Sequence, residues 1–115
     1  TLFRSEALDA YKKALALNPN SAQLMVDYAD LLAFQNKSIR GEPMRLIQKA
    51  LQIEPNNLKA LALAGTAYFE LGDFKKAEEY WTKAKNLVPA DSEFARGMTE
   101  NIAAAKAEAM NPSKK

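Results

Sequence analysis

The sequence predicts an all-α fold, a superhelix of stacked antiparallel helical hairpins closed by a C-terminal capping helix. Three segments end alike, with an alanine followed five residues later by a proline: residues 11–20, 47–56 and 81–90. Their prolines, Pro19, Pro55 and Pro89, follow one another at intervals of 36 and 34 residues. Such a period is typical of repeat proteins. Repeat architectures usually offer a binding surface, so the pattern favours recognition over chemistry.

The clearest repeat covers residues 58–91. Apolar residues at spacings of three and four predict a first helix up to Leu71. Gly72 can end that helix in a left-handed conformation, and Asp73 can cap the second helix. We expect Trp81 to pack between the two helices rather than to stack on a ligand. The unit matches the tetratricopeptide repeat (TPR) pattern at Leu61, Ala64, Gly65, Tyr68, Ala77, Trp81, Ala84 and Pro89.

The preceding repeat, residues 22–57, follows the same scheme with two extra residues. Ser21 is the expected N-cap of its first helix. The extra residues fall in a polar loop at 35–42, and Pro43 suits the first turn of the following helix. Pro43 stands where the third repeat has a small alanine, so local packing is expected to differ.

The two ends of the chain depart from the repeat. Residues 3–17 supply only the second helix of a first repeat, which leaves an apolar face and predicts a homodimer through this incomplete end. Residues 92–110 form an amphipathic helix that is expected to cap the array. The TPR domain thus covers residues 1–110, and residues 111–115 are expected to be a disordered tail.

Composition excludes several kinds of chemistry. The chain has no cysteine and no histidine, so disulfides, thiol or imidazole catalysis and the commonest soft metal ligands are absent. A formal charge of +2 gives no nucleic-acid footprint. The acidic pairs Asp27/Asp30 and Glu78/Glu79 are expected to be solvated. We therefore predict no enzyme, cofactor or metal, and no apolar run is long enough to span a bilayer.

The first helices of the repeats are expected to line a concave peptide-binding groove with an apolar floor and charged edges. A clamp of Lys and Asn for a C-terminal carboxylate is disfavoured, because only Lys59 could serve in it and Asp27 and Asp30 put the opposite charge on the neighbouring helix. The alternative is that the apolar members, which have no obvious internal partner, pack between neighbouring repeats or against the cap. The predicted groove residues are Val26, Asp27, Asp30, Phe34, Lys59, Ala62, Leu63, Thr66, Phe69 and Glu70.

A narrower resemblance covers roughly residues 5–109. Its most distinctive parts are the extended loop before Pro43 and the Tyr80-Trp81 pair followed by a capping helix. In these segments the chain resembles the C-terminal TPR domain of bacterial cytochrome c biogenesis factors. That group includes the apocytochrome c chaperone of the haem-attachment machinery and a nitrite-reductase haem lyase subunit. The matching segments are residues 29–33, 42–43, 46–51, 54–57, 60–70, 72–77, 80–83 and 101–105.

The resemblance implies a chaperone module that binds the C-terminal peptide or helix of apocytochrome c and presents it for haem attachment. It also implies other haem-lyase or cytochrome maturation subunits as partners. The expected location is the periplasm, with the parent protein anchored in the bacterial inner membrane by segments absent here. Two alternatives stay open: a generic TPR scaffold that contacts folded subunits in a multiprotein complex, and an accessory domain of an enzyme.

Overall fold

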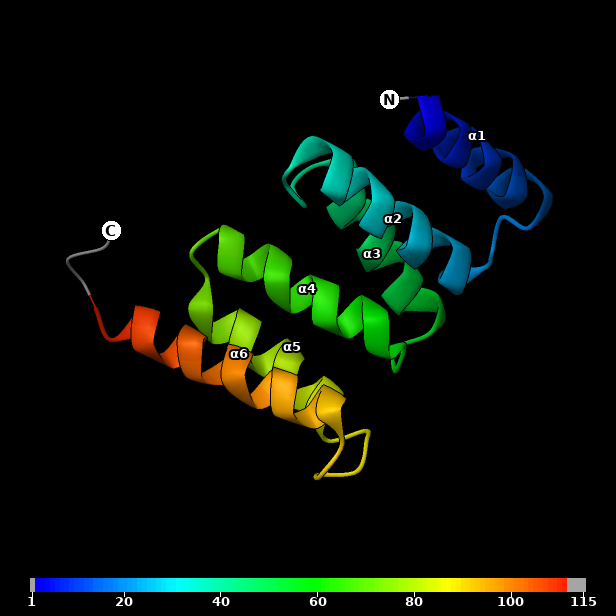
Figure 1. The fold of residues 1–115 in the computed structure, drawn as a ribbon. Helices are drawn as coiled ribbons and strands as arrows, with labels where there is room; N and C mark the ends of the chain where they lie inside the picture. Colours follow the sequence, from blue (N-terminus) through cyan, green and yellow to red (C-terminus); the bar gives the residue numbers. More distant parts are fainter. Residues whose placement is uncertain (1, 112–115) are drawn as a thin grey trace. The chain divides into compact units, whose positions relative to one another are not determined.

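A computed structural model describes residues 2–111, with the side chains of residues 6–111. Within that part of the chain every regular element is an α-helix and no strand occurs, which confirms the all-α prediction (Figure 1). The chain divides into two compact units, Thr1–Ala60 and Leu61–Lys115. The helices are α1 (Leu2–Leu17), α2 (Ala22–Asn36), α3 (Glu42–Ile53), α4 (Leu58–Glu70), α5 (Phe74–Lys85) and α6 (Glu93–Ala109).

The first unit is built around the α2–α3 hairpin. Ser21 begins α2 as predicted: its hydroxyl oxygen accepts a hydrogen bond from the Leu24 amide at 3.2 Å. Apolar residues at helical spacing on both helices are buried, which gives the pair its shared core. The buried side chains of this hairpin are Ala22, Met25, Val26, Tyr28, Ala29, Leu32, Pro43, Ile47 and Ala50.

The loop between α2 and α3 is held by one buried apolar side chain. Ile39 is only 2% exposed, although the loop reads as polar in the sequence. Lys37 ends α2 in the left-handed conformation with φ 56°, and its amide and that of Ser38 bond back to the last turn of α2. Gly41 supplies a second positive φ of 83° directly before α3, and Pro43 lies in the first turn of that helix. The predicted role of Pro43 in the first turn is confirmed.

Helix α1 packs against α2 within the same unit. The rings of Tyr11 and Tyr28 stack with their centroids 6.2 Å apart. Leu8 and Leu15 are half-buried, whereas Leu17 is 81% exposed at the end of the helix. Tyr11, on the face that the incomplete first repeat was expected to leave apolar and uncovered, therefore has a partner within this unit. The homodimer through this end stays a prediction.

In the second unit, Gly65 and Trp81 fix how α4 meets α5. The Trp81 side chain is 4% exposed, and its Nε1 donates a hydrogen bond to the Ala62 carbonyl at 3.0 Å. A Cβ atom on Gly65 would lie well inside van der Waals contact of the indole ring. The glycine is therefore needed to accommodate the tryptophan, which confirms the structural role predicted for Trp81.

Further aromatic contacts join the same two helices. Tyr68 on α4 stacks on Tyr80 of α5 with centroids 5.4 Å apart and planes 7° from parallel. The Phe69 ring meets Phe74 edge-on at 5.1 Å. Between the helices, Gly72 adopts a φ of 82° and the Asp73 carboxylate accepts from the Lys76 amide at 3.2 Å. The predicted roles of Gly72 as the end of the first helix and of Asp73 as the N-cap of the second are both confirmed.

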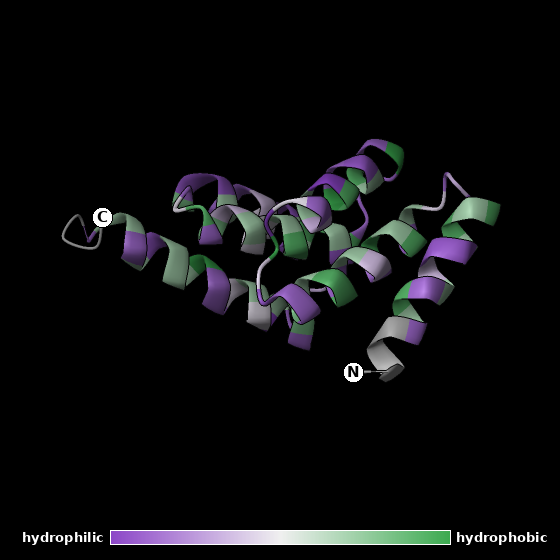
Figure 2. Cartoon of the chain, turned by 90° about the horizontal axis from the view of Figure 1, so that it is seen from above, coloured by the Kyte–Doolittle hydropathy of each residue, from purple (hydrophilic) through white to green (hydrophobic). Residues whose placement is uncertain are grey.

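Helix α6 packs along α5 and begins at Ser92, whose hydroxyl oxygen accepts from the Ala95 amide at 3.1 Å. Its buried residues are Ala95, Met98 and Ala105. Hydrophobic and hydrophilic segments alternate along this helix (Figure 2). Its exposed positions include both charged residues and alanines. The predicted tail at residues 112–115 lies outside the described residues.

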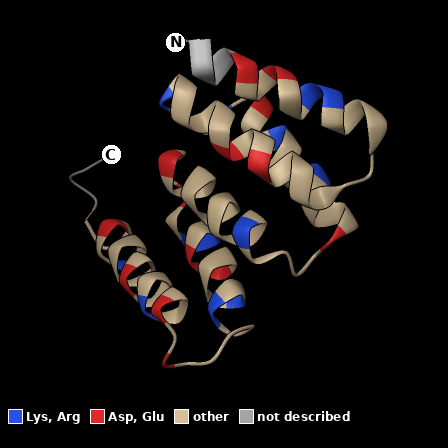
Figure 3. Cartoon of the chain, turned by 45° about the vertical axis from the view of Figure 1, so that its right-hand side comes forward, with Lys and Arg blue, Asp and Glu red and all other residues tan. Residues whose placement is uncertain are grey.

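Acidic and basic residues are interspersed on the helices rather than gathered by sign (Figure 3). One pair links Lys106 of α6 to Glu78 of α5 at 3.9 Å, a distance and exposure at which an ion pair contributes little. Over the described range, no helix combines the length and hydropathy needed to cross a membrane.

Candidate functional site

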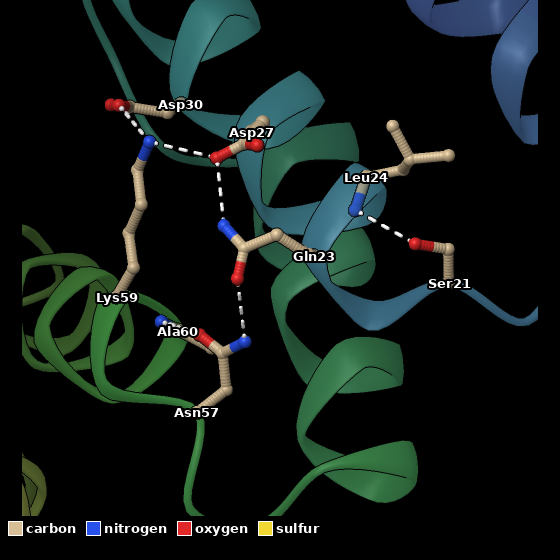
Figure 4. A network of polar contacts seen from close by, with 8 residues as sticks. All are labelled: Ser21, Gln23, Leu24, Asp27, Asp30, Asn57, Lys59 and Ala60. Atoms are coloured by element: carbon tan, nitrogen blue, oxygen red, sulfur yellow. Dashed lines mark hydrogen bonds and ion pairs between the residues drawn. The ribbon is translucent and has the colours of Figure 1, made fainter.

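A polar network connects α2 to the start of α4 within the first unit (Figure 4). Gln23, Asp27 and Asp30 lie on one face of α2 because they are spaced by four and three residues. Lys59 lies between the two carboxylates: its Nζ is 3.0 Å from Asp27 Oδ1 and 3.1 Å from Asp30 Oδ2. Gln23 Nε2 donates to the same Asp27 oxygen at 3.0 Å.

Asn57 continues the network and begins α4. Its side-chain oxygen accepts from the Ala60 amide at 2.9 Å, which is the N-cap bond of a helix. Its Nδ2 donates to Gln23 Oε1 at 3.1 Å and to Glu54 Oε1 at 3.0 Å. A cap residue of one helix is thereby hydrogen-bonded to the face of another, which fixes the position of Lys59 against α2.

The electrostatics of Lys59 follow from these contacts. Partial burial by itself would lower the pKa of its ammonium group, but hydrogen bonds and charge attraction from Asp27 and Asp30 outweigh burial and raise the pKa. The three side chains remain 28–48% exposed, so water screens them. The sequence had suggested that Asp27 and Asp30 are simply solvated. In the structure both carboxylates are ion-paired with Lys59.

The network forms one wall of a hollow in the first unit. The hollow has a volume of about 400 Å³ and is lined from α1, α2 and the beginning of α4. Phe34 is 64% exposed, and Leu31 is half-buried. Apolar and charged groups therefore meet on one concave surface. Its lining residues are Ala7, Tyr11, Asp27, Asp30, Leu31, Phe34 and Lys59.

Four of the groove residues predicted in this unit, Asp27, Asp30, Phe34 and Lys59, line that hollow. Val26 does not: it is fully buried at 0% exposure, so the expectation that it lacks an internal partner is wrong. Val26 belongs to the buried stripe of α2, which is wider than the repeat pattern alone suggests. The set of groove residues predicted on the first helices therefore loses Val26.

Sequence reasoning missed the contribution of α1. Ala7, Tyr11 and Leu31 also line the hollow, yet the sequence predicted no groove residue on α1. The spacing of Ala7 and Tyr11, one helical turn apart, places them on one face of α1. That spacing was a usable signal, but the incomplete first repeat hid which neighbour the face would meet.

The predicted groove residues of the second unit lie on α4. Leu63 and Ala62 are half-buried, while Thr66 and Glu70 are exposed; the Thr66 hydroxyl donates to the Ala62 carbonyl at 3.2 Å. Phe69 has internal partners after all, because its ring packs against Phe74 and lies 5.8 Å from the Trp81 ring. Its main contribution is to packing within the second unit.

The geometry bears on the kinds of ligand that the first-unit hollow can take. Lys59 already contacts two carboxylates, so it is not available as the cation of a clamp for a C-terminal carboxylate. No group of three or more acidic side chains in the described range is arranged to hold a metal ion. The hollow instead offers exposed apolar area beside partly neutralised carboxylates, which suits a peptide side-chain surface.

Comparison with known proteins gives a consistent family assignment. The model of the "Cytochrome c-type biogenesis protein H TPR domain" matches residues 3–95. A putative cytochrome c-type biogenesis protein CcmH from Haemophilus influenzae is 32% identical over 111 residues, which cover 94% of this chain and 24% of that protein. The formate-dependent nitrite reductase complex subunit NrfG from Escherichia coli O157:H7 is 31% identical over 84 residues, covering 72% and 42%.

A third relative is a much longer protein, of which the chain matches only a small part. The cellulose synthase operon protein C of Pseudomonas fluorescens is 32% identical over 94 residues, which cover 79% of this chain but 7% of that protein. The chain thus spans between about a quarter and two fifths of the first two relatives. The family model nevertheless covers most of the chain, including both hairpins and the extended loop. The chain therefore belongs to the TPR domain family of cytochrome c-type biogenesis protein H.

Proposed function

We propose that this chain is a peptide-binding chaperone module of cytochrome c maturation, which binds the C-terminal region of apocytochrome c. The observation that carries the proposal is the first-unit hollow, where the exposed Phe34 ring stands beside half-buried Leu31. A large exposed aromatic in a concave apolar surface is a common anchor for partner helices. The names of the family and of two relatives supply the biological context.

The mode of binding follows from the shape of the hollow. A client segment would lay its apolar side chains against Phe34 and Leu31, with its polar side chains toward Asp27, Asp30 and Lys59. In the second unit, the outward residues of α4 are proposed as a further contact: Ala62, Leu63, Thr66 and Glu70, with the edge of Phe69. An apocytochrome tail is disordered before binding, and ordering it costs free energy, so moderate affinity is expected.

The proposal also covers the setting. The parent protein would act in the periplasm, anchored in the inner membrane, and would meet other subunits of the haem-lyase or cytochrome maturation machinery. The TPR family suggests a non-catalytic binding module, and the proposal accordingly assigns no reaction step to this chain. Haem chemistry would belong to other components.

Calorimetric titration of the chain with synthetic C-terminal peptides of apocytochromes c tests the proposal. The native peptides should bind in the micromolar range and their scrambled versions at least tenfold more weakly, about 1.4 kcal/mol. Equal binding of native and scrambled peptides, or none, would contradict it. Binding of a folded cytochrome without any binding of its peptide would favour the scaffold alternative instead.

A matched pair of variants locates the binding surface. Phe34→Ala should weaken native-peptide binding by about tenfold, because it removes the central exposed ring of the hollow. Leu17→Ala is the control, since Leu17 is also strongly exposed in the first unit but does not line the hollow. Both variants should keep the helical circular dichroism of the parent chain. An equal effect of the two substitutions would place binding elsewhere.

A further inference from the structure

The charges around the first-unit hollow do not balance. Two carboxylates, Asp27 and Asp30, face one ammonium group, that of Lys59. Lys59 contacts a single oxygen of each carboxylate, and Gln23 shares the Asp27 oxygen that Lys59 already uses. Asp27 Oδ2 and Asp30 Oδ1 accept no hydrogen bond from a described residue. Counting only the described side chains, residues 6–111, the wall of the hollow has one net negative charge and two carboxylate oxygens that accept no hydrogen bond.

An aromatic ring accompanies this acceptor capacity. Phe34 follows Asp30 by four residues on α2, so the carboxylate and the ring lie one turn apart on the same helix face. Both line the same hollow with Tyr11 and Leu31. The Asp30 side chain is 48% exposed and the Phe34 residue 64%, so a partner can reach both groups at once.

This combination of carboxylate oxygen, aromatic ring and apolar wall fits one kind of side chain. A guanidinium group is a planar cation that donates hydrogen bonds to carboxylates and packs on aromatic rings, while its three-carbon stem covers apolar surface. An apolar occupant would remove water from the carboxylates and offer no donor in place of the hydrogen bonds that water had made. An acidic occupant would meet like charge, so the hollow also disfavours it.

We propose that the first-unit hollow selects a partner segment that carries an arginine one helical turn from an apolar residue, with the guanidinium group on Asp30 and the apolar residue on Leu31 and Phe34. This inference rests on the proposed function, because it names the side chain that the same surface reads. It adds a sequence preference: among C-terminal segments of clients, those with a basic residue one helical turn from an apolar residue bind better.

The test is a double-mutant cycle across the interface with a defined probe. The probe is a synthetic amphipathic peptide of about 20 residues, long enough for several helical turns, with a leucine face and one arginine four positions from a leucine. Its twin carries citrulline, which has the shape of arginine without the charge. A scrambled version of the arginine peptide measures nonspecific binding. Each peptide is titrated into the whole chain, into Asp30→Asn and into Glu100→Gln, a control carboxylate on α6.

Citrulline in place of arginine should weaken binding to the unmodified chain and to Glu100→Gln by about tenfold. With Asp30→Asn the same peptide change should alter the affinity less than twofold, because the carboxylate charge that the arginine contacts has been removed. If arginine and citrulline peptides bind the unmodified chain equally, and both better than the scrambled peptide, the arginine preference is overturned while peptide binding stands. If neither exceeds the scrambled peptide, both proposals fail.

Discussion

The hairpins α2–α3 and α4–α5 occupy the same repeat positions but use different side chains there. Where α4–α5 pairs Gly65 with Trp81, α2–α3 has Ala29 and Ile47 at the corresponding positions, and all four are buried. The second hairpin is thus organised around one large ring that requires a missing Cβ. The first has aliphatic side chains at these two positions, and its loop is anchored by the buried Ile39.

The exposed faces of the first helices differ even more. On α2, Gln23, Asp27 and Asp30 form a polar network with Lys59 beside an apolar hollow. On α4, the aromatic rings of Tyr68 and Phe69 instead pack against rings of α5. The repeat positions therefore set the fold of each hairpin, whereas the positions between them form the surface that we propose for recognition in the first unit.

The largest expected effect concerns the ring that distinguishes the second hairpin. Trp81→Ala should lower the free energy of unfolding by roughly 3–5 kcal/mol, because it leaves a large cavity and removes the hydrogen bond from Trp81 Nε1 to the Ala62 carbonyl. Urea denaturation followed by far-ultraviolet circular dichroism measures the loss. Hydrogen exchange should place it in α4–α6. A loss below about 1 kcal/mol would mean that Trp81 does not organise this hairpin.

Gly65 gives the next test of the same contact. Gly65→Ala should destabilise the chain by about 1–3 kcal/mol, since the new methyl group would overlap the Trp81 ring. Gly97→Ala is the matched control, because Gly97 is also helical and a Cβ there meets nothing within 4 Å. It should stabilise by about 0.5–1 kcal/mol through helix propensity alone. Stabilisation by both substitutions, measured by the same denaturation, would contradict the close contact.

The helix caps should show where the hairpins are alike. Ser21→Ala and Asp73→Ala each remove a side-chain acceptor that lies 3.2 Å from a backbone amide in the first turn. Each should cost about 1 kcal/mol in thermal or urea unfolding, the usual value for an N-cap. Costs that differ by more than about 1 kcal/mol would show that the two hairpins do not depend on their caps equally.

The smallest effect is expected for the charged network of the first unit. Lys59→Met should cost less than about 1 kcal/mol, because the ion pairs are half-exposed and screened. Lys12→Met, at an exposed site on α1, is the control and should be close to neutral. A cost above about 2 kcal/mol for Lys59→Met would mean that the network is a main support of the fold rather than a surface feature.

Alkaline titration separates the ion pairs from the packing of the Lys59 stem. The pKa of Lys59 is raised above its ordinary value of 10.5, so the folded state holds the proton more tightly than the unfolded chain. The resulting stabilisation is fully present below pH 10.5 and is lost as the pH rises through the higher folded-state pKa. The difference in stability between the parent chain and Lys59→Met should shrink over that alkaline range. A constant difference would assign the effect to packing.

The sequence predicted the fold well where repetition reveals it. The TPR spacing identified Gly65, Trp81, the helix end at Gly72 and the helix cap at Asp73, because these residues follow fixed steric rules. It failed at Ile39, since a single apolar residue in a polar loop carries no periodic signal. It also misplaced Val26, because a helix that packs on more than one side buries a wider stripe than a two-helix pattern predicts.

The candidate site was predicted only in part. Asp27, Asp30, Phe34 and Lys59 were chosen as first-helix residues, yet the pairing of Lys59 with both carboxylates depends on a contact between residues about 30 positions apart. Such a contact cannot be inferred from helical periodicity, which relates only residues within a few turns. The share of α1 in the hollow, through Ala7 and Tyr11, was missed for the same reason.

The central claim is that the first-unit hollow binds the client peptide, and nuclear magnetic resonance tests it most directly. A ¹⁵N-labelled chain is titrated with an apocytochrome C-terminal peptide, and amide shifts are followed residue by residue. The account predicts the largest changes around Tyr11, Asp30, Leu31 and Phe34, and small changes on α6. Changes confined to α5 and α6, or no changes at a saturating peptide concentration, would contradict it.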